Sequence, residues 1–135
     1  MRALFLILVL TLFSGIFMQA NAQTSKTYTA VLKVGKQKTV TPEKIKIQFV
    51  SLVEDSRCPT DAQCVWAGNA KIKVKISSRR DSQIVEMNTT TGGPLGASFD
   101  GYAINLTSLT PRPKSNIRIN RNGYTATFEI RRLMR

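Results

Sequence analysis

From residue 27 onward, the chain alternates hydrophobic and polar side chains in short runs that Gly, Pro and Asn residues separate. A period of two is typical of half-buried strands, because successive side chains of a strand point to opposite faces of the sheet. The pattern therefore predicts strands over residues 27–34, 39–41, 43–53, 69–77, 83–90 and 102–109.

A β-hairpin is expected at the C-terminal end of the chain. Asn122-Gly123 is a strong signal for a two-residue turn, because both residues tolerate the positive φ angles that a type I′ turn requires. In that register the facing pairs are Arg121 with Tyr124, Ile119 with Ala126, and Ile117 with Phe128. The inward pairs share one apolar face, which predicts that they lie in the core.

These elements predict an all-β fold. No amphipathic helix, internal repeat or low-complexity tract follows residue 23. About seven short strands at this spacing are typical of an antiparallel β-sandwich or a small barrel. The expected core faces carry Ile45, Ile47 and Phe49 on one strand, and Ile72, Val74 and Ile76 on another.

The N-terminal segment has the three parts of a secretory signal peptide. Arg2 provides a positive start, residues 3–17 are almost continuously apolar, and Ala20-Asn21-Ala22 places small residues at a cleavage site. A transmembrane anchor needs about 20 apolar residues, and Gln19 interrupts the run too early. We therefore expect residues 1–22 to be removed, and residues 23–135 to form one soluble domain in the periplasm or outside the cell.

The chain is strongly basic, with 20 Lys and Arg against 8 Asp and Glu among 135 residues and a formal charge of +12. Such a charge attracts anionic polysaccharide, lipopolysaccharide and phospholipid surfaces. It also attracts nucleic acid, which is the least accessible of these partners outside the cell. The alternative interpretation is that the charge keeps a small β protein soluble and its sheet edges unpaired.

The basic residues of the predicted strands are arranged by face. Lys44 and Lys46 share one strand face, and Arg118 lies on the outward side of the predicted hairpin. Lys71, Lys73 and Lys75 share the polar face of the 69–77 strand. If these strands belong to one sheet, their charges form one basic face with almost no acidic neighbour. Because it lacks interleaved aromatic side chains, the face suits a polymer bearing phosphate or sulfate better than single-stranded nucleic acid.

Histidine is absent, and this absence excludes much of the common catalytic chemistry. A Ser-His-Asp triad, a Cys-His pair and a His-containing zinc site all need it. No glycine-rich phosphate loop precedes a helix. We expect no catalytic residues, no metal site and no cofactor, and therefore a protein that is not an enzyme.

Both cysteines lie in the segment 54–68, which also holds the only tryptophan. In an exported protein such a pair predicts a disulfide, here Cys58–Cys64. A redox dithiol is disfavoured because its usual spacing is Cys-x-x-Cys beside a helix. Metal binding is disfavoured because two thiolates alone do not complete a tetrahedral site. Asp55 and Asp61 are expected to accept backbone N–H hydrogen bonds in the turns of the loop.

Trp66 has two interpretations. An exposed indole on a disulfide loop would serve as an anchor for a partner protein. An indole packed over the disulfide bridge would be structural, and this is the interpretation that we favour from the sequence.

The residues Asp55-Ser56-Arg57-Cys58-Pro59, followed by Cys64-Val65-Trp66-Ala67-Gly68-Asn69-Ala70, form a recognisable motif. It resembles that of small secreted or lipid-anchored bacterial envelope proteins of uncharacterised function, and Gly101-Tyr102 with Leu109-Thr110-Pro111 is similar to their second landmark. The resemblance implies an envelope location and a disulfide-bonded β domain, but no catalytic or binding residues. No cysteine follows the predicted cleavage site closely enough for lipid attachment, unlike in some of these relatives.

Two functions follow as expectations. The first is a non-enzymatic binding module that holds an anionic envelope polymer through the lysine-rich sheet face. The alternative is an inhibitor or assembly factor directed at an envelope protein, with the Cys58–Cys64 loop as its contact. The oligomeric state is left open by the sequence.

Overall fold

The computed structural model describes residues 25–40 and 42–134, so the predicted signal peptide lies outside the described residues. The described chain is built of strands and one short 3-10 turn, as the periodicity predicts. The strands are β1 (Thr27–Lys33), β2 (Gln37–Thr39), β3 (Lys46–Asp55), β4 (Ala70–Ser77), β5 (Ser82–Asn88), β6 (Gly96–Phe99), β7 (Tyr102–Thr110) and β8 (Thr125–Arg132), and the 3-10 turn η1 spans Arg121–Gly123.

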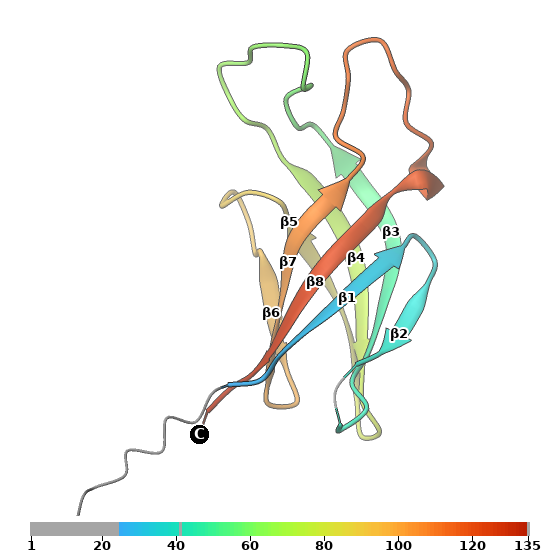
Figure 1. Cartoon of the computed structure of the whole chain (residues 1–135), viewed down its shortest axis with the longest axis vertical. Helices are drawn as coiled ribbons and strands as arrows, with labels where there is room; N and C mark the ends of the chain where they lie inside the picture. Colours follow the sequence, from blue (N-terminus) through green and yellow to red (C-terminus); the bar gives the residue numbers. More distant parts are fainter. Residues whose placement is uncertain (1–24, 41, 135) are drawn as a thin grey trace, which may run out of the picture.

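The strands form two four-stranded antiparallel sheets (Figure 1). One sheet has the order β1-β8-β7-β6 and the other has the order β2-β3-β4-β5. The inner faces of the two sheets pack against each other in a sandwich, and the buried apolar side chains of both sheets form a single cluster. The predicted all-β sandwich is confirmed, with one strand more than the sequence indicated.

The alternation along β3 and β4 explains the core. Ile47 and Phe49 on β3 and Ile72, Val74 and Ile76 on β4 are fully buried. The lysines that alternate with them on β4 point to the outer face of the sheet, where they are half-buried or exposed. Both faces of this strand therefore match the prediction.

The predicted C-terminal hairpin is wrong. The segment 111–124 is a long loop, and β8 instead lies between β7 and β1, where Phe128 pairs with Leu106 on one side and Ala30 on the other. In this central position β8 pairs along both edges and buries Ala126, Phe128 and Ile130 in the core. Ile117, predicted to be inside, is 60% exposed, whereas Ile119 is partly buried against the core.

Asn122 and Gly123 do not form the expected type I′ turn. These residues belong to η1, and the Asn120 side chain accepts a hydrogen bond from the Asn122 backbone amide at 2.9 Å. The capping residue is Asn120, which lies outside the Asn122-Gly123 pair, so this dipeptide alone does not decide between a hairpin turn and a 3-10 turn.

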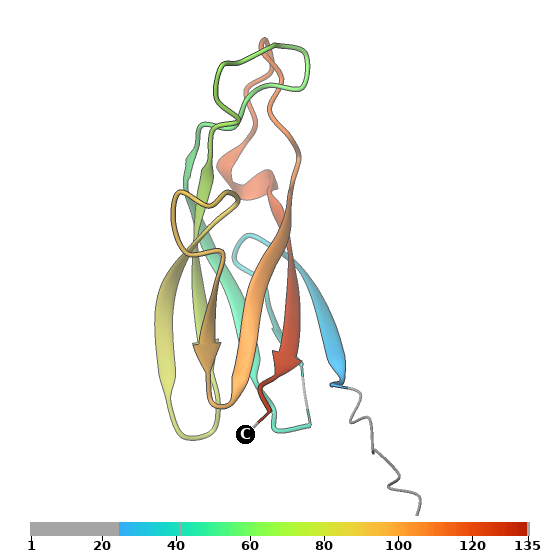
Figure 2. The same ribbon diagram turned by 90° about the vertical axis from the view of Figure 1, so that its left-hand side faces the viewer.

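The two ends of the sandwich differ. At one end, the β3–β4 connection (56–69) and the β7–β8 connection (111–124) project beyond the sheets (Figure 1), and the turned view also places them together (Figure 2). At the opposite end lie the short β4–β5 and β6–β7 turns, the start of β1 and the end of β8. We call these the loop end and the turn end.

Candidate functional site

The Cys58–Cys64 disulfide closes the tip of the β3–β4 connection, as the sequence predicts. The two Cα atoms lie 5.9 Å apart, and no free cysteine occurs in the described residues. Two backbone hydrogen bonds continue the β3–β4 ladder toward the disulfide, from Ser56 N to Asn69 O at 2.7 Å and from Cys58 N to Ala67 O at 2.9 Å. The loop is therefore an extension of a strand pair and has an ordered stem.

An ion pair between Asp55 and Arg57 lies at the base of this stem. Arg57 Nε donates to Asp55 Oδ1 at 2.8 Å and Arg57 Nη2 donates to Asp55 Oδ2 at 2.7 Å, so the pair is bidentate. Both side chains are only 8% exposed. A bidentate pair removed from water holds its geometry more firmly than a single surface contact does.

Arg57 also binds the β7–β8 connection. Its Nη1 atom donates to the carbonyl of Leu109 at 2.6 Å and its Nη2 atom donates to the carbonyl of Pro111 at 2.8 Å. One guanidinium thus links the stem of the disulfide loop to the end of β7. The sequence indicated Asp55 as an acceptor but did not reveal this role of Arg57, because its partners are backbone carbonyls 52 and 54 residues away.

Asp55 is held in its charged form. Burial by itself raises the pKa of this carboxyl, but the hydrogen bonds from Arg57 and from the Tyr124 hydroxyl outweigh burial and bring the pKa below its ordinary value. As predicted, Asp55 also accepts a backbone hydrogen bond, from Arg57 N at 3.2 Å. The carboxylate therefore has partners on both oxygens.

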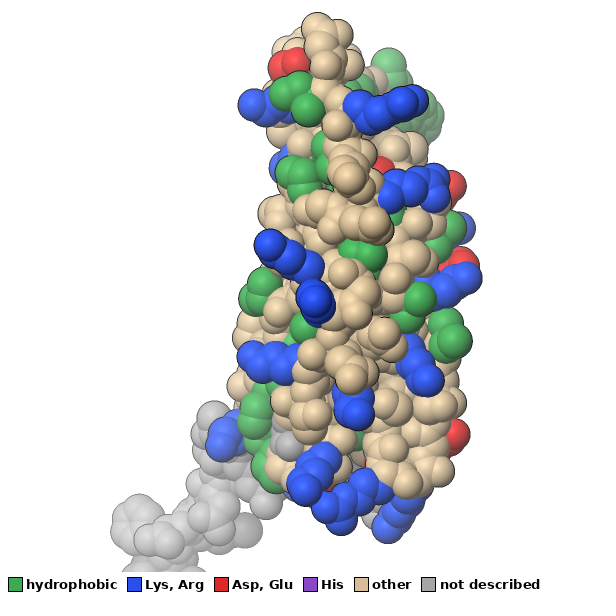
Figure 3. Space-filling view, turned by 90° about the vertical axis from the view of Figure 1, so that its right-hand side faces the viewer, with side chains coloured by type: hydrophobic (Ala, Val, Ile, Leu, Met, Phe, Trp, Pro, Cys, Tyr) green, Lys and Arg blue, Asp and Glu red, His purple; other side chains and the backbone are tan. Residues whose placement is uncertain are grey.

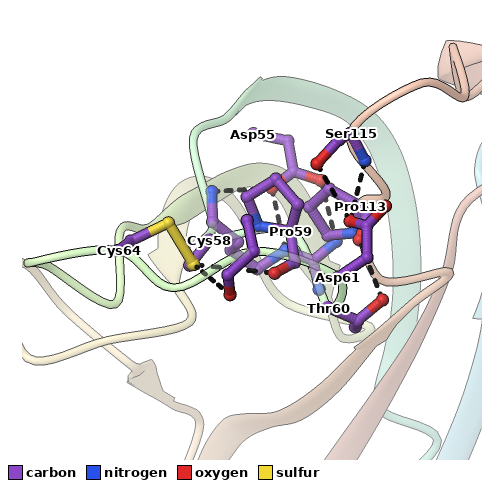
Figure 4. The surroundings of a disulfide bond; sticks show 10 residues. Asp55, Cys58, Pro59, Thr60, Asp61, Cys64, Pro113 and Ser115 are labelled. Carbon is purple, nitrogen blue, oxygen red and sulfur yellow. Dashed lines mark hydrogen bonds and ion pairs between the residues drawn. A yellow bond between two sulfur atoms is a disulfide. The ribbon is translucent and has the colours of Figure 1, made fainter.

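The two connections at the loop end are also joined nearer the tip (Figure 4). Thr60 N donates to the Pro113 carbonyl at 2.9 Å. Asp61 Oδ1 accepts from the backbone amide of Ser115 at 2.9 Å and from its hydroxyl at 3.0 Å. Asp61 thus accepts a backbone hydrogen bond as predicted, although its donor lies in the other connection.

Gly68 and Asn69 fix the returning side of the loop. Gly68 has φ +69°, and a Cβ at this position would overlap the backbone carbonyl of Ser56. The Asn69 amide nitrogen donates to Asn88 Oδ1 at 2.7 Å, and its Oδ1 atom accepts from the backbone amides of Thr89 and Thr90 at 3.1 and 3.3 Å. The stem is therefore attached to the β5–β6 connection as well.

The tip of the loop is free of such contacts. Val65 is 92% exposed and Trp66 is 81% exposed. The favoured prediction that the indole packs over the disulfide is wrong. The β3–β4 connection projects beyond the sheets (Figure 1), and its hydrogen bonds to the rest of the described chain are made by the stem and by Thr60 and Asp61, not by Trp66. Of the two interpretations, exposure of Trp66 holds.

The motif therefore has two parts with different roles. The first part builds and attaches the stem, and it consists of Asp55, Ser56, Arg57, Gly68 and Asn69. The second part is Val65 and Trp66, which make no such contact and are exposed to solvent. The attached stem and the exposed apolar tip are therefore distinct parts of the loop.

The predicted basic face is only partly assembled. Lys46 and the three lysines of β4 lie on the outer face of one sheet, since β3 and β4 pair directly. Lys71, however, has ion pairs with Glu54 at 3.8 Å and Glu86 at 3.9 Å. The expectation of almost no acidic neighbour is therefore wrong, because the strands on both sides of β4 each contribute a glutamate.

Lys44 and Arg118 lie outside this face. Lys44 has φ 61° and precedes β3 at the turn end, whereas Arg118 belongs to the β7–β8 connection at the loop end. The predicted face is thus reduced to Lys46, Lys71, Lys73 and Lys75, which we call the lysine face.

Within the described residues, no three His, Cys, Asp or Glu side chains gather as metal ligands would. That part of the chain also holds no helix long and apolar enough to span a membrane. Comparisons with protein-family models, with curated proteins and with solved structures found no match to this chain. The geometry of the loop end and of the lysine face is therefore the basis for assigning a function.

Proposed function

We propose that the protein is an exported, non-enzymatic binding module that docks its disulfide loop onto a partner protein. The observation that carries this proposal is the exposure of Val65 and Trp66 at 92% and 81% on a loop whose stem is fixed on several sides. Adjacent large apolar side chains in solvent are unfavourable for an isolated domain, and they gain free energy when a partner covers them.

The fixed stem makes the loop suitable for binding. Association costs free energy when flexible side chains and loops become ordered, and this cost is smaller when the loop is already held in place. Arg57, Asp61 and Asn69 attach the loop to two other connections, and the disulfide closes its tip. Tryptophan is enriched among the residues that contribute most to protein interfaces, because it buries a large rigid surface.

The charge around the tip indicates the chemistry of the partner. The β7–β8 connection, which is bonded to the loop through Pro113 and Ser115, carries four basic residues and no acidic residue. They are Arg112, Lys114, Arg118 and Arg121. The expected partner surface is therefore an apolar pocket for Trp66 with acidic side chains at its border.

Export is part of the proposal. The signal-like segment before Gln23, the disulfide and the resemblance of residues 55–70 to envelope proteins all support it. We expect cleavage after Ala22 and an oxidised mature protein in the periplasm or outside the cell.

The test is capture of a partner by immobilised protein from an extract of the cells that produce it, at low and at high salt. Contact through Trp66 predicts that one protein is retained at high salt by the wild type but lost with Trp66→Ala. The matched control is Ile84→Ala, which removes another exposed apolar side chain, 61% exposed, on the outer sheet face. It should retain the same protein.

The purified partner then allows the chemistry to be tested. Neutralising acidic residues around its binding pocket should slow association, whereas Trp66→Ala should speed dissociation. A partner retained equally by wild type and Trp66→Ala, or no protein retained at all, would contradict the proposal.

A second candidate function uses the lysine face, which would bind an anionic envelope polymer. Within the described residues, Lys46, Lys73 and Lys75 make no ion pair, and they share one outer face across β3 and β4. Unpaired cations on one face attract polyanions over about 10 Å at moderate salt.

This second function has its own signature. Replacing Lys46, Lys73 and Lys75 with Gln should weaken retention on immobilised polysaccharide or lipopolysaccharide and reduce its dependence on salt. Trp66→Ala should leave that retention unchanged. Equal retention of the triple variant and the wild type would exclude the lysine face.

A further inference from the structure

A large cleft opens at the turn end, on the opposite side of the molecule from the disulfide loop. Its volume is about 1230 Å³, and its lining comes from the start of β1, the segment before β3, the β4–β5 turn, the β6–β7 turn and the end of β8. Elements of both sheets therefore contribute to it. None of its residues was singled out from the sequence as a group, because they are far apart along the chain.

Cations predominate in this lining. The basic side chains are Lys26, Lys44, Arg79, Arg80 and Arg132, and the acidic ones are Glu43 and Asp100. Figure 3 shows blue side chains gathered at this lower end of the molecule. Such a concentration of one charge in a concave site raises the local potential above that of a flat surface with the same residues.

The acidic residues do not neutralise the cleft. Glu43 is engaged by Arg132 Nη1 at 3.2 Å and accepts a hydrogen bond from the Tyr102 hydroxyl. Among the described residues, Lys26, Lys44, Arg79 and Arg80 have no ion pair with any carboxylate. In the described lining, this leaves Asp100 as the one acidic residue to balance four unpaired cations.

Two arginines of this cleft are placed for anion recognition. Arg79 and Arg80 lie in the β4–β5 turn, are exposed, and make no ion pair in the described part of the chain. A guanidinium presents paired N–H donors that match two oxygens of a phosphate group, which a lysine does not. Lys26 lies over the Tyr28 ring, with its Nζ atom 5.5 Å from the ring centre, which places a further cation at the cleft.

We propose that this cleft binds a phosphate-bearing ligand, with Arg79 and Arg80 as its principal contacts. The volume of about 1230 Å³ is far larger than one inorganic ion needs and is of the size that accommodates organic ligands. The ligand is therefore a phosphorylated molecule, and the phosphate is supplied either by a soluble compound or by a lipid headgroup. This site goes beyond the proposed docking of the disulfide loop, which lies at the other end of the sandwich.

The test compares two double variants of equal charge change. Arg79→Gln/Arg80→Gln removes two cations from the cleft, and Lys33→Gln/Lys36→Gln removes two exposed cations from the end of β1 and the β1–β2 turn. In both variants the substituted residues lack ion pairs in the described structure, so folding should be preserved. Circular dichroism and thermal unfolding check this.

Two probes distinguish the source of the phosphate. Glycerol 3-phosphate, titrated by calorimetry, represents a soluble ligand. Vesicles of phosphatidylglycerol, compared with vesicles of phosphatidylcholine in a sedimentation assay, represent a lipid surface. The protein used is residues 23–135 without an added tag.

The proposal predicts binding to at least one probe and a loss of about tenfold or more in Arg79→Gln/Arg80→Gln, since one charge-assisted hydrogen bond corresponds to roughly that factor. Lys33→Gln/Lys36→Gln should change the affinity by less than about twofold, because its lysines lie at the opposite end of β1 from the cleft. Binding to glycerol 3-phosphate supports a soluble ligand, and binding to phosphatidylglycerol vesicles alone supports a headgroup.

Two results would overturn the proposal. The first is that neither probe binds to the wild-type protein at low salt. The second is that both double variants weaken binding equally, which would mean that net charge and not the cleft determines the interaction.

Discussion

Tyr124 donates its hydroxyl hydrogen to Asp55 Oδ2 at 2.9 Å, across 69 residues of sequence. The same oxygen accepts from Arg57 Nη2 at 2.7 Å, so one carboxylate joins the end of β3, the stem of the disulfide loop and the residue before β8. The two sheets of the sandwich are thereby bonded to each other at the loop end, and this carboxylate is one of the groups that hold the loop in position.

The first prediction concerns Asp55. Asp55→Asn should lower the free energy of unfolding at pH 7 by about 3–5 kcal/mol, because it leaves the Arg57 guanidinium in a largely buried site without its counter-charge. Chemical denaturation measures this change. Glu54→Gln, which removes a neighbouring exposed carboxylate, is the control and should cost less than about 1 kcal/mol.

The same carboxylate predicts a dependence on pH. Since the pKa of Asp55 is lower in the folded than in the unfolded protein, its contribution is present above the unfolded pKa of about 3.9 and is lost as pH falls through the folded value. Wild-type stability should therefore fall below about pH 4, and part of that fall should be absent in Asp55→Asn. If the stability of Asp55→Asn falls with decreasing pH as much as that of the wild type, groups other than Asp55 cause the fall.

A glycine substitution tests the close approach at the stem. Gly68→Ala should destabilise the protein strongly, because it combines a positive φ with overlap against the Ser56 carbonyl. Gly35→Ala is the matched control, since Gly35 has φ +79° but nothing within 4 Å of the added Cβ. The control should lose about 1–2 kcal/mol of stability from backbone strain alone. The midpoint temperature of thermal unfolding should therefore be clearly lower for Gly68→Ala than for Gly35→Ala.

The position of the indole can be measured directly, because Trp66 is the only tryptophan. At 81% exposure, its fluorescence should resemble that of an indole in water and should be quenched efficiently by iodide. Unfolding the protein should shift the emission only slightly. A blue-shifted emission protected from iodide would instead support packing over the disulfide.

Two substitutions test the corrected topology at the C-terminal end. Phe128→Ala should reduce the free energy of unfolding by about 3–5 kcal/mol, because Phe128 is fully buried between the sheets. Ile117→Ala should change it by less than about 0.5 kcal/mol, because Ile117 lies in the exposed β7–β8 connection. A hairpin with these residues facing each other would make both substitutions costly.

The disulfide has a limited energetic role. Closing a loop as short as residues 58–64 stabilises by about 2 kcal/mol through chain entropy, so Cys58→Ser/Cys64→Ser should fold with that deficit. Mass spectrometry of the protein, isolated and alkylated without reductant, should find no free thiol. Detection of two alkylated cysteines would instead support a redox function of the pair.

The sequence predicts the sandwich because its strands obey a simple periodicity. On β4 every second residue is apolar, so a single pattern determines both the buried face with Ile72, Val74 and Ile76 and the outer face with the lysines. Such alternation is reliable because a shift of one residue would bury the charges. The periodicity did not predict β6 (Gly96–Phe99), because this strand is short and follows a glycine-rich segment.

The sequence was less informative about the loop end, where distant residues decide the structure. The Asn122-Gly123 signal is local, whereas the position of β8 depends on β1, nearly a hundred residues earlier in the chain. The exposure of Trp66 depends on how far the β3–β4 connection projects beyond the sheets, which no spacing rule predicts. The cysteine pairing, by contrast, needed only the number of cysteines and the signal-like segment at the N-terminus.

The chain enters β1 and leaves β8 at the turn end, away from the disulfide loop (Figure 1). A protein attached to a sensor surface by either terminus is therefore oriented, with Val65 and Trp66 directed toward the solution and the basic cleft directed toward the support. Measurements of partner proteins benefit from this orientation. Measurements of phosphate compounds or vesicles need the protein free in solution, because the support would shield the cleft.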